Sequence, residues 1–547
     1  MNRLFYGDCL TIMRDHMNLG SVDLIYLDPP FNSNREYNAI YKDETGRPLP
    51  DQIDAFCDLW EMDQERERVL QAMPVLMREA GIDDKAAEFW RLWMNALRYT
   101  QPRLLAYLSY MVERLLLMKG ILKPTGSVYL HCDPTASHYI KAMMDAIFGH
   151  ERFQNEITWR RYSRPKGSQH RAKRYGRSSD VLLFYTKGNS HTFNGDEIRV
   201  PLSDADIEKR FPSEDEKGRF MSGPLLRSPS MGDRPNLVFE FQGYTPGPFG
   251  WRMVREKLQE IYDRGDFYFT SNGVPRRKFR PAEEPGEIID NIWTDIDALG
   301  SQDQERMGYA TQKPLPLLER IIKASSNPGD VIFDPFCGCA TTLEAAHNLG
   351  RKWVGIDIAI HAVKRVAKVR LQERMHLVEG EHFTIEGVPR NIEGARDLWS
   401  RDKYHFQKWA VEQVDGFVTT RQSGDGGVDG RIYFAMPAND AYKSRGLENM
   451  VIEVKGGKNV GINVIRELSG VLDNDEALLA GLIILEPLGE RKERNFRKFM
   501  AEAGDLDVLG IQYPRLQMLT AEEILEGKRF HTPGAVGRVD QAALPLT

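Results

Sequence analysis

Apolar runs too continuous for half-exposed strands recur along the chain, and helical patterns separate them. "RLFY" and "VDLIYL" lie near the N-terminus, and "VIFD" and "KWVGID" repeat the pattern after residue 330. Continuous apolar strands that alternate with amphipathic helices are typical of a parallel sheet with helices on both faces. The sequence therefore predicts an α/β fold whose two halves are far apart along the chain.

The stretch "DLIYLDPPFNSN" ends the second of these strands in an unusual way. Pro29 and Pro30 lock two φ angles and remove two backbone donors, so neither helix nor sheet continues through them. Open α/β sheets bind ligands at the carboxyl ends of their strands, which is where Asp28 and Phe31 stand. We therefore predict a functional turn here, with a plain linker as the alternative.

A second turn follows the strand "VIFD" in "VIFDPFCGCATTLEAAHNLGRKWVGID". Asp334 ends that strand, a turn of small residues leads into a helix near Thr341, and the next strand ends in Asp357. Small residues let a ligand approach the backbone, and an acid after the second strand binds ribose hydroxyls. The turn lacks the full G-x-G-x-x-G pattern, which suits a nucleoside without a pyrophosphate, such as S-adenosylmethionine. The alternative is an ordinary α/β turn with two structural acids.

The 547 residues carry a formal net charge of −6, so nucleic-acid contact has to come from local basic patches. "WRRYSRPKGSQHRAKRYGR" and "RRKFR" are such patches, and Trp159, Tyr162 and Tyr175 interleave with the first. Aromatic rings stack on bases while Arg and Lys hold phosphates. Residues 155–305 are therefore predicted to contact DNA, and a solvated charged surface is the alternative.

Five scattered cysteines fit a reducing cytoplasm. Cys337 and Cys339 lack a second ligand pair, so zinc is not predicted. A signal-peptide pattern and an apolar stretch of about 18 residues are both missing, which favours a cytoplasmic protein without a membrane span. No G-x-x-x-x-G-K-[ST] pattern occurs, so an ATP motor is not expected in this chain.

Together, "LDPPF" and "FDPFCGCATT" resemble the two signature motifs of DNA amino-methyltransferases. Their order, catalytic motif before cofactor loop, resembles the β class of that family over roughly residues 1–375. The resemblance implies a Rossmann-like S-adenosylmethionine-dependent sheet with an inserted target-recognition region, acting on double-stranded DNA. It implies a catalytic motif of Asp28, Pro29, Pro30 and Phe31. It implies a cofactor set of Asp8, Lys313, Asp334, Phe336, Gly338, Thr341 and Asp357.

The roles within the catalytic motif follow from the chemistry of an exocyclic amine, whose lone pair is delocalised into the base. Asp28 and the carbonyl of Pro29 would accept hydrogen bonds from the amine, and Phe31 would stack on the extruded base. Within the family, Asp at the first position favours adenine N6, and cytosine N4 is the alternative. For Asp8 a structural turn or helix cap is the alternative. The basic insertion argues against RNA or protein glutamine as the methyl acceptor.

The cofactor loop departs from the family pattern FxGxG at its last glycine, which is Ala340 here. An alanine adds one methyl group and disfavours positive φ. We therefore expect this loop to bind the cofactor somewhat less well than the usual sequence would.

A second chemistry-bearing region lies in "SGDGGVDGRIYF" and "MVIEVKGG". Alternation places Glu453 and Lys455 on one face of a strand, and Asp429 stands upstream. The Asp…Glu-x-Lys pattern resembles PD-(D/E)xK nucleases, and the glycine turn resembles Mrr-type domains, over roughly residues 400–485. The resemblance implies Mg²⁺ on Asp429 and Glu453, with Lys455 positioning water.

Two features leave the nuclease interpretation open. The acid usual in the first helix is replaced by "FQ" at 406–407, with Glu412 as a substitute. Glu453 and Lys455 alone would be read as a surface ion pair. The rival hypotheses are a non-catalytic DNA-binding or assembly module, and a DNA-binding regulator with an inactive methyltransferase fold.

The predicted organisation therefore combines the methyltransferase sheet with a smaller α/β restriction-endonuclease-like domain in a restriction–modification protein. Its parts are a catalytic half (1–154), a target-recognition insertion (155–305), a cofactor half (306–378), a linker (379–400), a nuclease-like domain (401–527) and a flexible tail (528–547). The sequence allows a homodimer but does not determine the oligomeric state.

Overall fold

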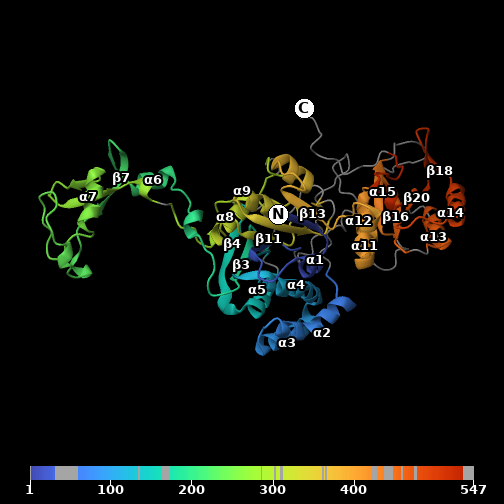
Figure 1. Ribbon diagram of the computed structural model, residues 1–547, viewed down its shortest axis with the longest axis horizontal. Helices are drawn as coiled ribbons and strands as arrows, with labels where there is room; N and C mark the ends of the chain where they lie inside the picture. Colours follow the sequence, from blue (N-terminus) through green and yellow to red (C-terminus); the bar gives the residue numbers. More distant parts are fainter. Residues whose placement is uncertain are drawn as a thin grey trace. The chain divides into compact units, whose positions relative to one another are not determined.

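The computed structural model describes residues 2–30, 60–133, 136–162, 173, 175–284, 286–300, 303–307, 312–359, 362–363, 366–419, 428–435, 447–457, 460–473 and 477–533. Packing divides the chain into two compact units. Unit 1 comprises Met1–Phe193 with Asn291–Thr547, and unit 2 comprises Asn194–Asp290 (Figure 1).

Within the described part of unit 1, nine strands form one sheet in the order β10-β4-β5-β3-β2-β11-β12-β1-β13. Their bounds are β1 Asn2–Tyr6, β2 Val22–Leu27, β3 Leu122–Cys132, β4 Phe153–Arg160, β5 Ser179–Thr186, β10 Ile292–Trp293, β11 Val331–Asp334, β12 Lys352–Asp357 and β13 Phe383–Glu386. The strands from β3 to β13 in this order are parallel, and β5 is antiparallel to both of its neighbours. The predicted parallel α/β sheet is confirmed.

Helices pack around this sheet. They are α1 Cys9–His16, α2 Gln64–Glu79, α3 Asp84–Thr100, α4 Pro102–Ile121, α5 Ser137–Phe148, α8 Leu315–Ser325, α9 Thr341–Asn348 and a π-helix over Val366–Arg374. Of these, α2 and α3 lie on other helices, α4 and α5, rather than on the strands. Phe5, Ile25 and Phe333 of the strands share one core with Met111 and Leu115 of α4. Ile332 is also fully buried, and strand alternation turns it toward the opposite face. Both faces of the sheet are therefore covered, as the continuous apolar strands require.

A second sheet of unit 1 has the order β14-β15-β16-β17-β20. We call it, with its helices, the C-terminal region. Its elements are α11 Ile392–Arg401, α12 Lys403–Gln413, β14 Phe417–Val418, β15 Gly430–Ala435, β16 Leu447–Lys455, α13 Ile462–Asp473, β17 Leu479–Ile484, α14 Glu490–Glu502, the hairpin β18 Asp505–Val508 and β19 Ile511–Pro514, β20 Leu516–Thr520 and α15 Ala521–Leu525. Strands β15 and β16 are antiparallel, whereas β16, β17 and β20 are parallel.

Unit 2 contains a four-stranded sheet in the order β6-β7-β9-β8. Its elements are α6 Asp204–Arg210, β6 Ser213–Asp215, β7 Gly218–Pro224, α7 Arg255–Asp263, β8 Phe267–Phe269 and β9 Pro275–Phe279. Short 3-10 turns occur at Gly195–Ile198, Pro229–Met231, Pro235–Leu237 and Pro281–Glu283, and another at His150–Arg152 of unit 1. Trp251, Phe241 and Leu258 form a core separate from that of unit 1.

The structure differs from the predicted boundaries in three places. Strands β4, β5 and β10 belong to the large sheet, so the inserted unit spans only Asn194–Asp290. The segment expected to be a linker contains β13, which pairs with β1, and α11. In the segment expected to be a tail, Phe530 is buried, and residues 534–547 lie outside the described part.

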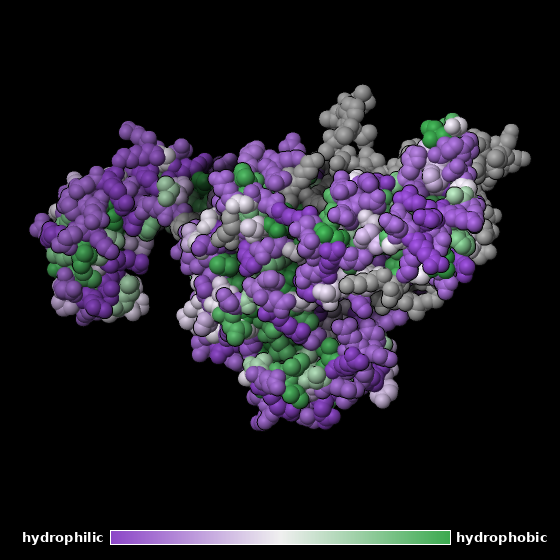
Figure 2. Space-filling model, turned by 45° about the vertical axis from the view of Figure 1, so that its right-hand side comes forward, coloured by the Kyte–Doolittle hydropathy of each residue, from purple (hydrophilic) through white to green (hydrophobic). Residues whose placement is uncertain are grey.

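Hydrophilic residues cover most of the face seen in Figure 2, with an apolar patch low in the view where α2 and α3 lie. Phe89, Leu92 and Tyr99 of α3 are exposed. Among the described residues, every helix is too short or too polar to cross a bilayer.

Candidate active sites

Four acids predicted from the sequence stand at one edge of the large sheet. Asp28 follows β2, Asp334 ends β11, Asp357 ends β12, and Asp8 follows β1 by one residue more. These strands are parallel neighbours in the order β2-β11-β12-β1, so their carboxyl ends meet. We call this edge, with the residues 335–342 that follow β11, the cofactor edge. Sequence positions more than 300 residues apart thus become adjacent.

Asp28 has one carboxylate oxygen bound and one oxygen without a partner. Its Oδ2 forms an ion pair with Lys313 Nζ, and both side chains are largely buried. Its Oδ1 is buried and accepts no hydrogen bond within the described part of the chain. Leaving a buried carboxylate oxygen without a hydrogen-bond donor costs free energy of folding. Oδ1 of Asp28 is such an oxygen, an unused acceptor at the cofactor edge. Pro29 and Pro30 follow directly, and Phe31 lies outside the described residues.

Lys313 reaches this position from the segment before α8. The structure pairs its ammonium group with Asp28, and the cofactor contact that the resemblance implied stays a prediction. Gln312 anchors the same segment, since its amide accepts a hydrogen bond from Met307 N (2.8 Å) and donates one to the Glu305 carbonyl (2.8 Å). These hydrogen bonds to neighbouring backbone thus fix the main chain next to Lys313.

Asp334 is buried and holds the loop that follows it. Its Oδ1 accepts a hydrogen bond from Phe336 N (3.0 Å), and its Oδ2 accepts one from the Thr342 hydroxyl (2.6 Å). Burial, more than any other effect, raises the pKa of Asp334 to about 7. Phe336 packs against the main core, and Thr341 begins α9. Asp334 therefore shapes the loop. Near pH 7 its carboxyl group is partly protonated and partly ionised.

Asp357 ties the end of β12 to the same loop. Its Oδ2 accepts a hydrogen bond from Gly338 N (2.8 Å), and its Oδ1 accepts one from Ala359 N (2.8 Å). Burial raises the pKa of Asp357 to about 6. Gly338 has a φ of 48° and Ala340 a φ of 57°, so the alanine adopts the left-handed conformation that the family's glycine adopts freely. The loop keeps its shape at the expense of local strain.

Asp8 acts as a helix cap in the structure. Its Oδ1 accepts hydrogen bonds from Leu10 N (2.9 Å) and Thr11 N (3.4 Å) at the start of α1. Its Oδ2 pairs with Arg114 Nη2 at 2.6 Å, and that guanidinium lies over the Tyr110 ring. The capping role left open by the sequence is therefore present, and a contact with the cofactor stays a prediction.

A buried polar chain behind the catalytic strand was not foreseen. Tyr26 Oη lies 3.0 Å from His131 Nδ1, His131 Nε2 lies 3.2 Å from Asp180, and Asp180 lies 3.3 Å from Arg161. Burial raises the pKa of Tyr26 well above its usual value, so its hydroxyl donates to Nδ1 and leaves Nε2–H to donate to Asp180. Each member looks like an ordinary strand residue in the sequence, which gives no signal for the chain.

The basic segment after Trp159 divides into buried and exposed residues. Trp159 is buried and its indole N–H donates to the Ile296 carbonyl (2.7 Å), so its predicted role as a base-stacking residue is wrong. Tyr175 is fully exposed and remains available for such a role. Tyr162 is half-buried, and residues 163–172 lie outside the described part.

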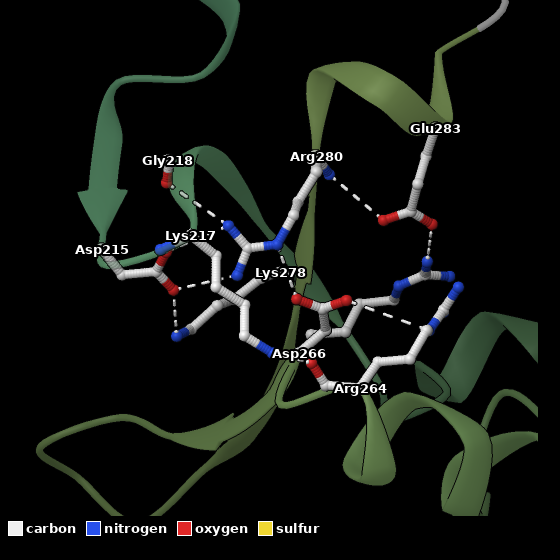
Figure 3. A network of polar contacts seen from close by, with 9 residues as sticks. Asp215, Lys217, Gly218, Arg264, Asp266, Lys278, Arg280 and Glu283 are labelled. Carbon is white, nitrogen blue, oxygen red and sulfur yellow. Dashed lines mark hydrogen bonds and ion pairs between the residues drawn. The ribbon is translucent and has the colours of Figure 1, made fainter.

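Cations of the second basic run, "RRKFR" at 276–280, form ion pairs inside unit 2 (Figure 3). Asp215 pairs with Lys278 (2.6 Å) and Arg280 (3.0 Å), and Arg280 also pairs with Asp266 (2.8 Å). Hydrogen bonds from Arg280 hold the pKa of Asp215 well below its usual range. These cations join β6, β9 and the residue before β8, so they stabilise the unit itself.

The predicted residues of the C-terminal region come together around the end of β16. Asp429 Oδ2 accepts a hydrogen bond from Val454 N (2.7 Å), between Glu453 and Lys455. Lys455 Nζ lies 2.6 Å from Glu453 Oε1, and Glu453 is 1% exposed. Burial raises the pKa of Glu453, and the charges of Asp429 and Glu467 raise it further. Two carboxylates and one lysine therefore converge, as the spacing suggested.

A further acid acts on this cluster through its charge. Glu467 lies on α13, and its charge acts on both Glu453 and Lys455. Glu412, the substitute suggested by the sequence, lies on α12, and its charge acts on Tyr6 at the end of β1. Sequence spacing alone could not select between the two helices.

Comparison with known proteins locates the shared region. A model of the N6/N4 methyltransferase family, described as DNA methylase, matches residues 22–368. Type II methyltransferase M.EcaI of Enterobacter cloacae is 35% identical over 271 residues, covering 48% of this chain and 57% of that protein. The Mod subunit of the type III restriction-modification enzyme StyLTI of Salmonella typhimurium is 26% identical over 365 residues, covering 64% and 50%. DNA adenine methyltransferase YhdJ of Escherichia coli is 41% identical over 90 residues, covering 16% and 29%.

The chain spans about half the length of the first two relatives. The matched residues 22–368 include Asp28, Lys313, Asp334 and Asp357, and they end before α11.

Proposed function

Because the chain belongs to the N6/N4 DNA methylase family, we propose that it transfers a methyl group from S-adenosylmethionine to an exocyclic amine of a base in double-stranded DNA. One observation carries the proposal: Asp28 Oδ1 is a buried acceptor without a donor among the described residues, at the edge where the cofactor loop lies. An exocyclic amine supplies the donor that this oxygen lacks.

The chemistry follows from the state of Asp28. An ionised carboxylate only accepts hydrogen bonds, so Oδ1 would take one N–H of the amine and draw its lone pair out of conjugation. Lys313 holds Oδ2 and prevents the carboxylate from turning away. The rigid carbonyl of Pro29 would accept the second N–H, and Phe31 would stack on a base extruded from the duplex.

The cofactor edge fits S-adenosylmethionine, which would supply a methyl group on a positively charged sulfur. The residues between Phe336 and Thr341 are small, which leaves backbone accessible to a nucleoside. Asp357 has both oxygens in hydrogen bonds, but a carboxylate has about four acceptor positions and can still bind ribose hydroxyls. Asp8, Gly338 and Thr341 would line the rest of the nucleoside end.

Adenine N6 is the proposed target, with cytosine N4 as the alternative, and the setting is a restriction–modification system. Unit 2 and the exposed segment around Tyr175 are the proposed DNA-recognition parts. Asp28, the first residue of the proline motif, supports adenine as the target. Among the relatives, YhdJ is named an adenine methyltransferase, and the StyLTI Mod subunit is named part of a restriction-modification enzyme.

Incubation of unmethylated plasmid with the protein and radiolabelled S-adenosylmethionine tests the proposal. After digestion to nucleosides we expect label in N6-methyladenine, and Asp28→Asn should abolish it. Asp23→Asn is the matched control, since Asp23 lies on the same strand and pairs with Lys123 (2.8 Å) away from the cofactor edge. Undiminished transfer by Asp28→Asn would refute the role of this carboxylate. Label in N4-methylcytosine would select the alternative base.

The C-terminal cluster supports a second proposed function, Mg²⁺-dependent DNA cleavage. Asp429 and Glu453 offer the oxygen ligands that Mg²⁺ prefers, and Lys455 would orient the attacking water. Within the described residues, no three His, Cys, Asp or Glu side chains are placed to hold a metal ion. Water and a DNA phosphate would therefore have to complete the coordination, as is common for Mg²⁺. Bound Mg²⁺ would act as a Lewis acid at that phosphate.

Plasmid nicking with Mg²⁺, with and without S-adenosylmethionine, tests this second function. Wild type should nick, while Asp429→Ala and Lys455→Ala should not. Absence of nicking by wild type, with Asp429→Ala altering only DNA binding, would instead establish a non-catalytic module.

A further inference from the structure

Helix α12 of the C-terminal region reaches the end of β1. His405 on this helix lies edge-on against Tyr6, with ring centroids 4.4 Å apart and planes at 85°. Both residues are buried, at 4% and 3% exposure. A Cβ placed on Gly7 would lie 3.8 Å from His405 Cε1. His405 therefore fills the space directly beside the turn that follows β1.

That turn belongs to the cofactor edge. Gly7 N donates a hydrogen bond to the Asp357 carbonyl (3.0 Å), which joins the turn to the end of β12. Asp8 follows and caps α1. A side chain that packs against Tyr6 and Gly7 thus fixes where Asp8 lies relative to Asp357.

Shape rather than hydrogen bonding holds the contact. Tyr6 Oη and His405 Nε2 are both buried without a hydrogen-bond partner in the described part of the chain. Burial lowers the pKa of His405 to about 4, so the ring is neutral at physiological pH. Two unsatisfied polar atoms at one contact are destabilising, and such groups in a folded protein call for an explanation. A role in positioning the neighbouring cofactor edge is one such explanation.

The same helix packs tightly into the C-terminal region. Phe406 and Trp409 are fully buried. A Cβ on Gly430 would lie 2.4 Å from Val411 Cγ1, so α12 presses directly on the residue after Asp429. The position of His405 is thereby set by the C-terminal sheet.

A second close approach supports the same helix pair. A Cβ on Gly456 would lie 2.2 Å from Trp399 Cδ2, so α11 presses on the residue after Lys455. Trp399 and Phe406 are also in edge contact, with centroids 5.5 Å apart. Helices α11 and α12 therefore form one packed body between the end of β1 and the cluster at β16.

We propose that His405 is a positioning residue for the cofactor site, which holds the Tyr6–Gly7–Asp8 turn in the conformation that binds the nucleoside end of S-adenosylmethionine. The proposal rests on the proposed methyltransferase function. It makes cofactor binding depend on a residue from outside the matched family region, which ends at residue 368.

Calorimetric binding of two ligands to the full chain tests the proposal. S-adenosylhomocysteine has both a nucleoside and an amino-acid end, whereas 5′-methylthioadenosine lacks the amino-acid end. His405→Ala should weaken both by a similar factor of about ten, a size usual for residues that act through a neighbour. His405→Phe keeps a ring in the same space and should bind within about threefold of wild type.

Tyr404→Ala is the matched control, because it removes a 37% exposed ring from the same helix. It should leave both affinities unchanged. Wild-type affinity in His405→Ala, an equal loss in Tyr404→Ala, or a loss confined to S-adenosylhomocysteine would each overturn the proposal. Should His405→Ala melt early, His405→Phe decides: wild-type binding supports the packing role, and a tenfold loss refutes it. Failure of wild type to bind either ligand would instead refute the proposed function itself.

Discussion

Asp334 allows a quantitative test of the electrostatics at the cofactor edge. Burial of the carboxyl, which is 2% exposed, raises the pKa of Asp334 to about 7, against 3.8 for a free side chain. Because the folded form holds its proton more tightly, folding stability falls as pH rises from about 4 to 7 and stays low above that range. Once both forms are ionised, the loss amounts to about 4 kcal/mol, an order-of-magnitude value.

Asp334→Asn removes this loss without removing the loop contacts. The amide oxygen can accept the Phe336 N–H, and the Thr342 hydroxyl can turn to accept from the amide nitrogen. The variant should therefore have a larger free energy of unfolding than wild type. That difference should be about 2 to 3 kcal/mol larger at pH 8 than at pH 5. It should also bind S-adenosylhomocysteine less well if the carboxylate serves the cofactor.

Urea unfolding of both proteins, followed by tryptophan fluorescence at pH 5 and pH 8, measures the difference. Asp330→Asn is the control, because Asp330 precedes the same strand at its other end and is partly open to solvent. A stability difference that does not change with pH, or a variant less stable at both pH values, would show that Asp334 ionises without penalty. The burial argument would then be wrong.

Three further predictions concern other contacts. Lys313→Met should reduce methyl transfer at least about 100-fold, because the ammonium group holds Asp28. The affinity for S-adenosylhomocysteine should change less than about threefold. A parallel loss of that affinity would show that Lys313 also binds the cofactor. Ala340→Gly should raise S-adenosylhomocysteine affinity modestly, about two- to fivefold by calorimetry, because glycine adopts the φ of 57° without strain; weaker binding would show that the methyl group packs usefully. Arg280→Met should accelerate limited proteolysis within residues 194–290 and spare unit 1, because Arg280 joins Asp215 and Asp266; unchanged proteolysis would show that the network is dispensable.

Elements built from local pattern could be predicted from the sequence, and contacts between distant elements could not. The strands ending at Leu27 and Asp334 are continuous apolar runs, so their type and their carboxyl ends were readable. Parallel packing then implied that the acids after them meet. The pair between Asp28 and Lys313 joins residues 285 positions apart, and no local pattern selects it.

Errors arose where composition stood in for packing. Lys278 and Arg280 of "RRKFR" form ion pairs with Asp215 of β6 and Asp266 before β8, which the string alone does not show; contact of this run with DNA stays a prediction. Trp159 has the composition of a base-stacking site, yet alternation in β4 turns it inward, where its N–H finds a carbonyl. The short strand β13, Phe383–Glu386, lies in a polar stretch, and only pairing with β1 makes it a strand.

The charges at the cofactor edge discriminate between ligands by sign. Asp28 follows β2, Asp334 and Asp357 end the next two strands of the sheet, and Lys313 is paired with Asp28. In the proposed reaction, a donor with positive sulfur would gain more from the ionised fraction of Asp334 and Asp357 than a neutral thioether product would, which would favour exchange of spent cofactor for fresh. Under the proposed function, ionised carboxylates at this edge would repel DNA phosphates, so cations elsewhere would have to hold the duplex. In the proposed reaction, extrusion of the base from the duplex would keep those phosphates away from the carboxylates of the edge.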